Sequence, residues 1–130
     1  MYEQTSHNIR ITVEPAYLDE QSKPEENYHV WAYTIGIENH SREPVTLKTR
    51  YWKITDAQGR VQEVRGAGVV GEQPTLKPGQ RFEYTSGAPL STPTGFMVGA
   101  YQMQHDDGEV FEVDIPAFSL DSPHTAGKLH

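Results

Sequence analysis

The strongest structural signal in the sequence is the segment Tyr28-His29-Val30-Trp31-Ala32-Tyr33-Thr34-Ile35-Gly36-Ile37-Glu38-Asn39. Large apolar side chains occupy every second position, and small or polar side chains lie between them. The large ones are Trp31, Tyr33, Ile35 and Ile37. A period of two with one bulky apolar face predicts a β-strand that lies with this face against a core.

The segments on either side repeat this alternation. Residues 8–14 place Ile9, Ile11 and Val13 on one face, and turn residues follow at spacings of roughly 8–12 residues. We expect further strands at 45–55, 60–64, 82–86, 95–104 and 110–115. No segment has a helical period, so the sequence predicts an all-β fold. The expected architecture is an antiparallel β-sandwich of the immunoglobulin or fibronectin type III kind, with about seven strands.

The segment 45–55 departs from simple alternation. Val45 and Leu47 differ in parity from Trp52 and Ile54. A β-bulge between Leu47 and Trp52 would bring both pairs to the core face. The alternative is a strand with both faces partly covered.

Polar and proline-containing segments set the expected loops and boundaries. The acidic segment 19–27 is expected to be a mobile loop, and 86–94 a loop broken by prolines. Pro116 is expected to end the last strand, because proline cannot donate to a ladder. We therefore expect one domain over residues 1–120 and a flexible tail over residues 121–130.

The composition of the chain argues against several classes of function. The 130 residues suit one domain, and a net charge of −7 makes the chain a poor ligand for nucleic acid. The absence of cysteine excludes disulfides, thiolate metal sites and thiol catalysis. No apolar run resembles a signal peptide or a membrane span, so we expect a cytoplasmic protein that does not contact membranes.

Three glycines at G-x-G-x-x-G spacing occur in Arg65-Gly66-Ala67-Gly68-Val69-Val70-Gly71-Glu72-Gln73-Pro74. In dinucleotide-binding folds this spacing follows a strand and opens a helix. Here the residues after Gly71 do not favour a helix, and no βαβ unit surrounds them. We expect a non-helical connection between the sheets. The alternative is that backbone amides form a nest for a phosphate or pyrophosphate. The candidate anion-binding residues are Arg65, Gly66, Gly68 and Gly71.

Residues with catalytic or metal-binding chemistry do not form a recognised motif. His105, Asp106, Asp107 and Glu109 lie around an expected hairpin turn, where aspartate is common for conformational reasons. Neighbouring strand residues also point to opposite faces, which makes them poor joint ligands. No serine lies in a nucleophile-elbow pattern. We expect no metal site, no catalytic residue and no cofactor.

The sequence resembles the ApaG family over nearly its whole length, most specifically in the central block Val64-Arg65-Gly66-Ala67-Gly68-Val69-Val70-Gly71-Glu72-Gln73-Pro74. The segments that carry the resemblance are 8–13, 33–39, 50–56, 59, 63–74, 76–79, 95–97, 99, 101–103, 111–116 and 118.

This resemblance implies a fibronectin type III-like sandwich and no established enzymatic activity. Bacterial members are associated with cobalt tolerance and magnesium efflux, and their gene neighbours a diadenosine tetraphosphate hydrolase. Related domains occur in F-box proteins and in a DNA-polymerase-interacting protein, where protein–protein interaction is the expected role. The function expected here is a non-enzymatic interaction module with an unidentified protein partner. The alternatives are a phosphate or pyrophosphate binder and a direct cobalt or magnesium sensor.

Overall fold

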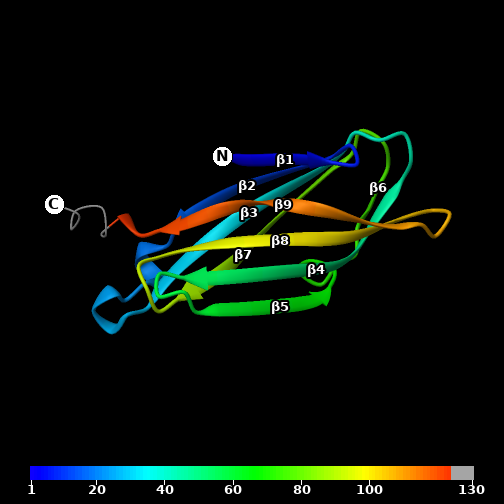
Figure 1. The fold of residues 1–130 in the computed structure, drawn as a ribbon. Coiled ribbons are helices and arrows are strands. Elements are labelled where there is room, and N and C mark those ends of the chain that lie inside the picture. The colour runs from blue at the N-terminus through cyan, green and yellow to red at the C-terminus, as the bar shows by residue number, and fades with distance from the viewer. Residues whose placement is uncertain (124–130) are drawn as a thin grey trace.

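A computed structural model of the chain describes residues 1–123 as two antiparallel β-sheets packed face to face (Figure 1). Strands make up most of the described chain, and the two short 3-10 turns η1 and η2 lie between β2 and β3. The strands are β1 (Tyr2–Ser6), β2 (Ile9–Tyr17), β3 (His29–Asn39), β4 (Val45–Asp56), β5 (Val61–Ala67), β6 (Thr75–Leu76), β7 (Arg81–Leu90), β8 (Thr94–His105) and β9 (Val110–Asp121). The turns are η1 (Asp19–Gln21) and η2 (Pro24–Glu26). Neither is long and apolar enough to cross a membrane, and the described residues contain no other helix that is.

The two sheets differ in how their edges are covered. One sheet has the order β1-β2-β3-β7; the other has the order β5-β4-β8-β9, with β6 also paired to β4. On one side of the sandwich β9 lies against β1 and β2 (Figure 1). On the opposite side, β7 and β5 are the end strands of their sheets. As formed by residues 1–123, the sandwich is therefore closed along β9 and has free strand edges along β5 and β7.

The core confirms the alternation expected for the strongest segment. Trp31, Ile35 and Ile37 of β3 are at most 1% exposed. Trp52 of the second sheet packs edge-on against Tyr33 of the first, with ring centroids 5.4 Å apart. Burial of large apolar and aromatic side chains from both sheets is the main driving force for this packing.

The predicted β-bulge in β4 is confirmed. The register between β4 and β8 shifts between Leu47 and Thr49, which leaves Lys48 as the extra residue. This shift turns both Leu47 and Trp52 toward the core, where they are 2% and 3% exposed.

Several predicted strand ends are wrong, and edge geometry explains two of them. The segment 86–94 was expected to be a loop, yet β7 continues through Pro89 to Leu90. Pro89 is accepted because, within residues 1–123, β7 pairs only with β3 and has a free edge. Likewise β9 continues past Pro116, where the register with β8 shifts. A bulge on an end strand is a position that tolerates proline.

The chain forms more strands than the seven expected, because β1 and β6 were not predicted. β1 pairs with β2 through the two-residue turn His7-Asn8, whose φ angles are 50° and 63°. Positive φ at both central positions defines the type I′ turn, which normally carries glycine. His7-Asn8 gives a much weaker signal, so the hairpin escaped detection.

The predicted domain boundary also lies too early. Asp121 is the last residue of β9, and Ser122 is buried, with its amide donating to the Pro93 carbonyl at 2.8 Å. These two residues belong to the folded domain. Residues 124–130, the remainder of the predicted tail, lie outside the described residues.

Candidate functional site

The glycine motif lies at the end of β5 and in the turn that follows it. Gly66 is a strand residue of β5. The Val69 and Glu72 amides and carbonyls exchange hydrogen bonds of 2.8 and 2.9 Å, which closes a two-residue turn at Val70-Gly71. Their φ angles of 43° and 82° make it a type I′ turn. The non-helical conformation expected for this segment is confirmed.

The expectation that this segment connects the two sheets is wrong. The strand before it, β5, and the strand after it, β6, both pair with β4 of the same sheet. The bulge at Lys48 anchors the segment, because the Lys48 carbonyl accepts hydrogen bonds from the Gly68 amide and the Gln73 side chain, each at 2.9 Å. The turn is thus fixed to its own sheet.

Arg50 and the turn itself explain why glycine is needed at two positions of the motif. Its Nη1 donates to the Gly68 carbonyl at 2.9 Å and to the Ala67 carbonyl at 3.2 Å. A Cβ on Gly66 would lie 2.7 Å from the same nitrogen. A Cβ on Gly68, whose φ is +62°, would lie 2.1 Å from the Glu72 carbonyl oxygen. Packing against Arg50 and within the turn therefore accounts for Gly66 and Gly68.

Val70 is strained at the tip of this turn. A β-branched residue with positive φ is a conformational outlier, and its apolar side chain is 56% exposed. Such strain costs on the order of 1–3 kcal/mol and is concentrated at functional sites. The turn tip is therefore a candidate contact surface.

Arg65, the charged member of the predicted anion site, lies on the outer face of the sheet. Its guanidinium lies 4.6 Å from the centre of the Tyr51 ring and 3.4 Å from the Glu63 carboxylate. The Tyr51 hydroxyl donates to the same carboxylate at 2.8 Å. The positive charge of Arg65 is thus already compensated in part.

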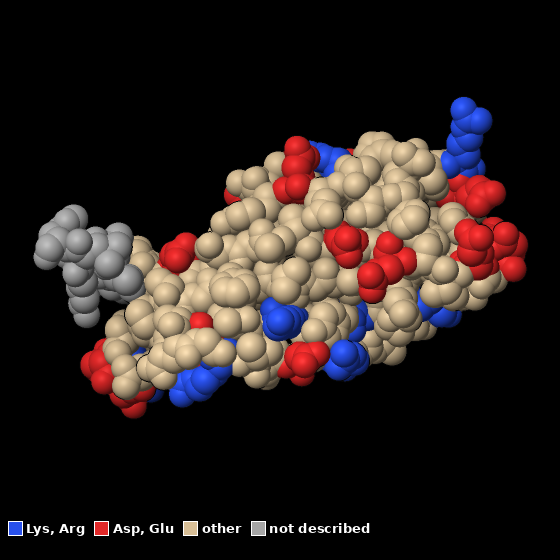
Figure 2. Space-filling view, viewed as in Figure 1, with Lys and Arg blue, Asp and Glu red and all other residues tan. Residues whose placement is uncertain are grey.

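Arg65 also lines an open groove of about 590 Å³ on this outer face, which Arg50 and Gly66 border as well. Glu112 also lines this groove. Figure 2 shows basic side chains over β4 and β5 and acidic ones over β9. The groove is therefore bordered by both signs of charge.

The backbone amides of the turn are largely used inside the protein. The Gly68 amide binds Lys48, and the Val69 and Glu72 amides bind each other's carbonyls. An anion nest needs several amides directed at the ligand. The assignment of Arg65, Gly66, Gly68 and Gly71 to anion binding stays a prediction.

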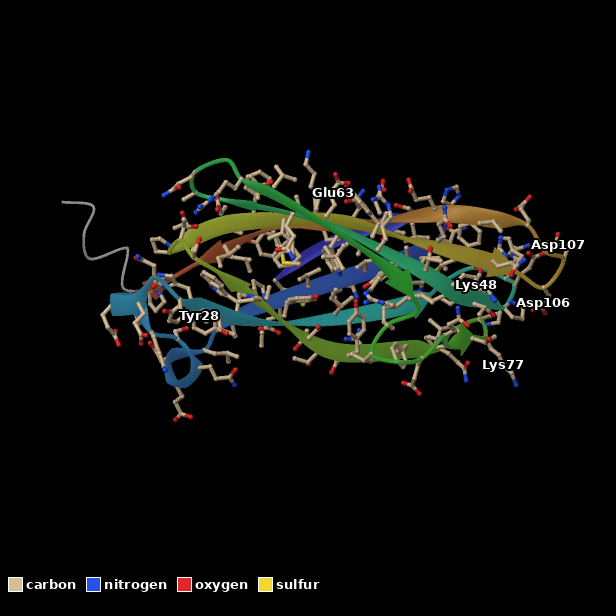
Figure 3. All side chains as sticks on the ribbon, turned by 90° about the horizontal axis from the view of Figure 1, so that it is seen from below. Tyr28, Lys48, Glu63, Lys77, Asp106 and Asp107 are labelled. Atoms are coloured by element: carbon tan, nitrogen blue, oxygen red, sulfur yellow. The ribbon has the colours of Figure 1, made fainter. Side chains whose placement is uncertain are left out.

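A second cavity opens between the free edges of β5 and β7, and we call it the seam. It has a volume of about 220 Å³ and its wall includes Trp52, Val64, Met97, Tyr33, Arg50 and Ser86. Figure 3 views the sandwich from the side where β5 and β7 are the last strands of their sheets. Arg50 is a lining residue of both the seam and the outer groove.

Tyrosine hydroxyls lie behind the seam. The Tyr84 and Tyr101 hydroxyls form a buried hydrogen bond of 2.5 Å. Burial raises the pKa of both phenols well above the ordinary value, and the Arg50 charge opposes the rise only weakly. Burial also raises the pKa of Tyr33, against a hydrogen bond from Ser86 and the charge of Arg50. These hydroxyls are neutral at physiological pH, so none neutralises Arg50.

Sequence reasoning named Arg65 but missed Arg50 as a site residue. The signal was present in the hairpin turn at 56–59, because continuing its register pairs Arg50 with Gly66. The predicted strand stopped at Val64, whereas β5 continues to Ala67. Because the predicted strand ended before Gly66, the pairing of Arg50 with Gly66 was not predicted.

The residues weighed as a metal site lie at the far tip of the β8–β9 hairpin. His105 stacks on Phe111 with centroids 4.5 Å apart, and its Nδ1 lies 3.3 Å from the Glu43 carboxylate. Asp106 and Asp107 occupy the tip beside it (Figure 3). Within residues 1–123, no three His, Asp or Glu side chains are grouped to hold a metal ion.

Comparison with known proteins shows that the chain is similar to proteins of one family. The ApaG domain model matches residues 19–105. The chain is 61% identical to Protein ApaG of Parvibaculum lavamentivorans over 130 residues, which is the full length of both chains. It is 65% identical to Protein ApaG of Rhodospirillum centenum over 124 residues, covering 95% of each chain. The crystal structure of a protein described as ApaA from Bordetella pertussis is 48% identical, with a TM-score of 0.87 over 92% of this chain and 97% of that one.

Proposed function

The chain belongs to the ApaG domain family, and on this basis we propose that it is a non-enzymatic protein-interaction module of the cytoplasm. The partner is a protein that contacts the turn Val69-Val70-Gly71-Glu72 and the adjacent strand edge. The association of bacterial family members with cobalt tolerance and magnesium efflux supports a role for this interaction in divalent-cation homeostasis.

The observation that carries this proposal is the exposed, strained Val70. An apolar side chain at the tip of a tight turn gains little inside the protein, since it is 56% exposed. The backbone cost of positive φ would be removed by asparagine or glycine, which the type I′ turn prefers. Contact with a partner protein would bury the Val70 side chain and so offset the cost of its backbone conformation.

Affinity capture with two matched variants tests the proposal. Val70→Asn removes the apolar tip but suits the turn. Val110→Asn removes a valine of almost equal exposure, 55%, from β9, which is the end strand of the second sheet opposite β5. The tagged wild type and Val110→Asn are expected to retain the same protein from a native-host extract, whereas Val70→Asn retains much less. Equal capture by all three, or no retained protein, would contradict the proposal.

One observation favours a second candidate function, the binding of phosphate or pyrophosphate. Arg65 and Gly66 border the outer groove together with Arg50. Titration with pyrophosphate, followed by amide chemical shifts, should then perturb Gly66, Gly68 and Gly71. Unchanged shifts at these glycines at millimolar pyrophosphate would remove this candidate.

The link to divalent cations can be direct or can act through the partner. Calorimetric titration of tag-free protein with Co²⁺ and with Mg²⁺ separates the two routes. We expect no binding heat at millimolar cation, because the proposal places the cation chemistry in the partner. Saturable heat at one equivalent would instead make the chain itself a cation sensor.

A further inference from the structure

Within residues 1–123, Arg50 has no carboxylate partner, unlike four other arginines. Arg10, Arg60, Arg65 and Arg81 each lie close to at least one Asp or Glu side chain. Arg50 is half-buried, and in the part of the chain that the structure describes its hydrogen bonds go only to the carbonyls of Ala67 and Gly68. A guanidinium removed from water without a counter-ion is unfavourable, so the site favours a carboxylate ligand.

The guanidinium faces the seam rather than only the outer groove. Arg50 influences the pKa of Tyr33, Tyr84 and Tyr101, which lie between the sheets. A Cβ on Gly66 would meet its Cζ at 2.9 Å, so the guanidinium lies flat over β5. Two of its five N–H groups at most are used by the carbonyls, because both bonds come from Nη1. The remaining donors form a fork that matches a carboxylate.

The nearest acidic side chain on β5 cannot serve as that ligand. Glu63 is on the outer face, where Tyr51 and Arg65 bind it. Figure 3 shows Glu63 on the side of its sheet that points away from β7. Because no acidic side chain within residues 1–123 pairs with Arg50, a carboxylate ligand would come from outside these residues.

The walls of the seam indicate how the carboxylate is carried. Trp52, Val64 and Met97 give an apolar lining, and β5 borders it with a free strand edge. Alternate residues of an edge strand direct amides and carbonyls outward, where an added strand can pair with them. An extended peptide would satisfy the edge and bury apolar side chains in the seam at once.

We propose that the seam binds an extended segment of a partner protein, with an Asp or Glu side chain on Arg50 and a backbone that pairs with β5. This inference rests on the proposed interaction function and specifies the chemistry of the partner. The glycine motif contributes by leaving room for Arg50 at Gly66 and by holding it through the Gly68 carbonyl. Charge complementarity selects the carboxylate, and the free edge of β5 selects the extended backbone.

Two capped peptides test the proposal directly. The probe is acetyl-Val-Thr-Glu-Thr-Val-amide, in which the two valines and the glutamate share one face of an extended chain. Its control has glutamine in place of glutamate. Titrations are followed by amide chemical shifts of the full chain. The glutamate peptide is expected to perturb residues of β5 and β7 and to bind at least about tenfold more tightly than its control. Equal binding of both peptides, or no perturbation by either at millimolar concentration, would overturn the proposal.

Arginine variants locate the contact. Arg50→Gln should abolish the preference for glutamate, and Arg50→Lys should keep part of it because the charge remains but the fork is lost. Arg65→Gln removes a neighbouring arginine from the outer face and should leave the preference unchanged. Loss of the preference in Arg65→Gln but not in Arg50→Gln would move the carboxylate site to the outer groove and contradict the proposal. The dispersion of the amide spectrum reports whether each variant is folded.

The outcome also separates this inference from the proposed function. If Val70-dependent capture of a partner is observed but the peptides show no glutamate preference, the seam inference alone fails. If the glutamate preference is observed but no partner depends on Val70, the turn tip is not the contact surface.

Discussion

The Arg50 guanidinium occupies the space that a side chain at Gly66 would need. A Cβ built on Gly66 would lie 2.7 Å from Nη1 of Arg50, the cross-strand neighbour of Gly66 in the β4–β5 hairpin. Real Cβ atoms are not found at that distance from another heavy atom. Gly66, one of the three glycines at G-x-G-x-x-G spacing, thus leaves the space that the Arg50 guanidinium occupies.

Gly66→Ala should lower the free energy of unfolding by about 1–3 kcal/mol, because the new methyl group displaces a well-held guanidinium. Gly87→Ala is the matched control on the other free edge, where a Cβ would meet only the Trp31 carbonyl at an ordinary 3.6 Å. It should raise stability by roughly 0.5 kcal/mol, since glycine is costly in a strand. Urea unfolding measures both. Equal effects of the two substitutions would argue against a steric role for Arg50.

Val70→Asn should raise the free energy of unfolding by about 1 kcal/mol, because asparagine tolerates the positive φ that strains valine. Val110→Asn should lower it, because asparagine is unfavourable in the strand where Val110 lies. Thermal unfolding of the two variants measures the difference. A Val70→Asn protein less stable than wild type would show that the valine contributes to the fold itself.

Tyr101→Phe should cost about 1–3 kcal/mol, because it leaves the buried Tyr84 hydroxyl without its 2.5 Å partner. The variant with phenylalanine at both positions removes the two hydroxyls together and should recover part of this loss. Denaturant unfolding of the single and double variants measures the cost. A single variant as stable as wild type would mean that water satisfies Tyr84.

The hydrogen-bonded pair Tyr84 and Tyr101 also predicts how the stability of the protein changes at alkaline pH. Burial raises the pKa of Tyr84 and of Tyr101 above the ordinary value of about 10. The folded state therefore keeps protons that the unfolded state releases, so stability is complete below about pH 10 and falls as the pH rises further. Unfolding at about pH 9 and about pH 11 should show a smaller loss in the double phenylalanine variant than in wild type. An identical loss would exclude these phenols as the cause.

Glu38 predicts the opposite dependence in acid. A hydrogen bond with His40 lowers the pKa of Glu38; burial opposes this, and bonds from Arg81 and Arg10 add to it. A lowered folded pKa stabilises the protein above the unfolded value of about 4.3, and this stabilisation is lost as the pH falls through the folded value.

Glu38→Gln should therefore be less stable than wild type by about 1 kcal/mol at neutral pH and equal to it below about pH 3. Glu25→Gln, at an exposed position on η2, should match wild type throughout. Chemical unfolding across this pH range measures the difference. A gap between Glu38→Gln and wild type that persists in acid would have to come from packing rather than charge.

The sequence predicted the sandwich because its core residues alternate strictly, as at Trp31 to Ile37, and because the bulge near Lys48 leaves a change of parity. It did not predict β1, because the His7-Asn8 turn lacks glycine, or the full length of β7, because proline on a free edge behaves unlike proline in a central strand. The alternation of residues could not identify the family of the chain. The resemblance to the ApaG family did so, and the comparisons confirm it.

The candidate site was harder to predict, because it depends on contacts between strands. Arg65 and the glycines are neighbours in sequence and were named for that reason. Arg50 reaches them only through the β4–β5 register, sixteen positions from Gly66 along the chain but directly opposite it in the sheet. The seam requires in addition that β5 and β7 both remain at sheet edges, and no local pattern specifies this.

A double-mutant cycle of Arg50→Ala and Gly66→Ala tests most directly whether the glycine motif serves to hold Arg50. We predict that Gly66→Ala costs about 1–3 kcal/mol in the presence of Arg50 and nearly nothing in the Arg50→Ala background, where the space is free. An equal cost of Gly66→Ala in both backgrounds would contradict this account.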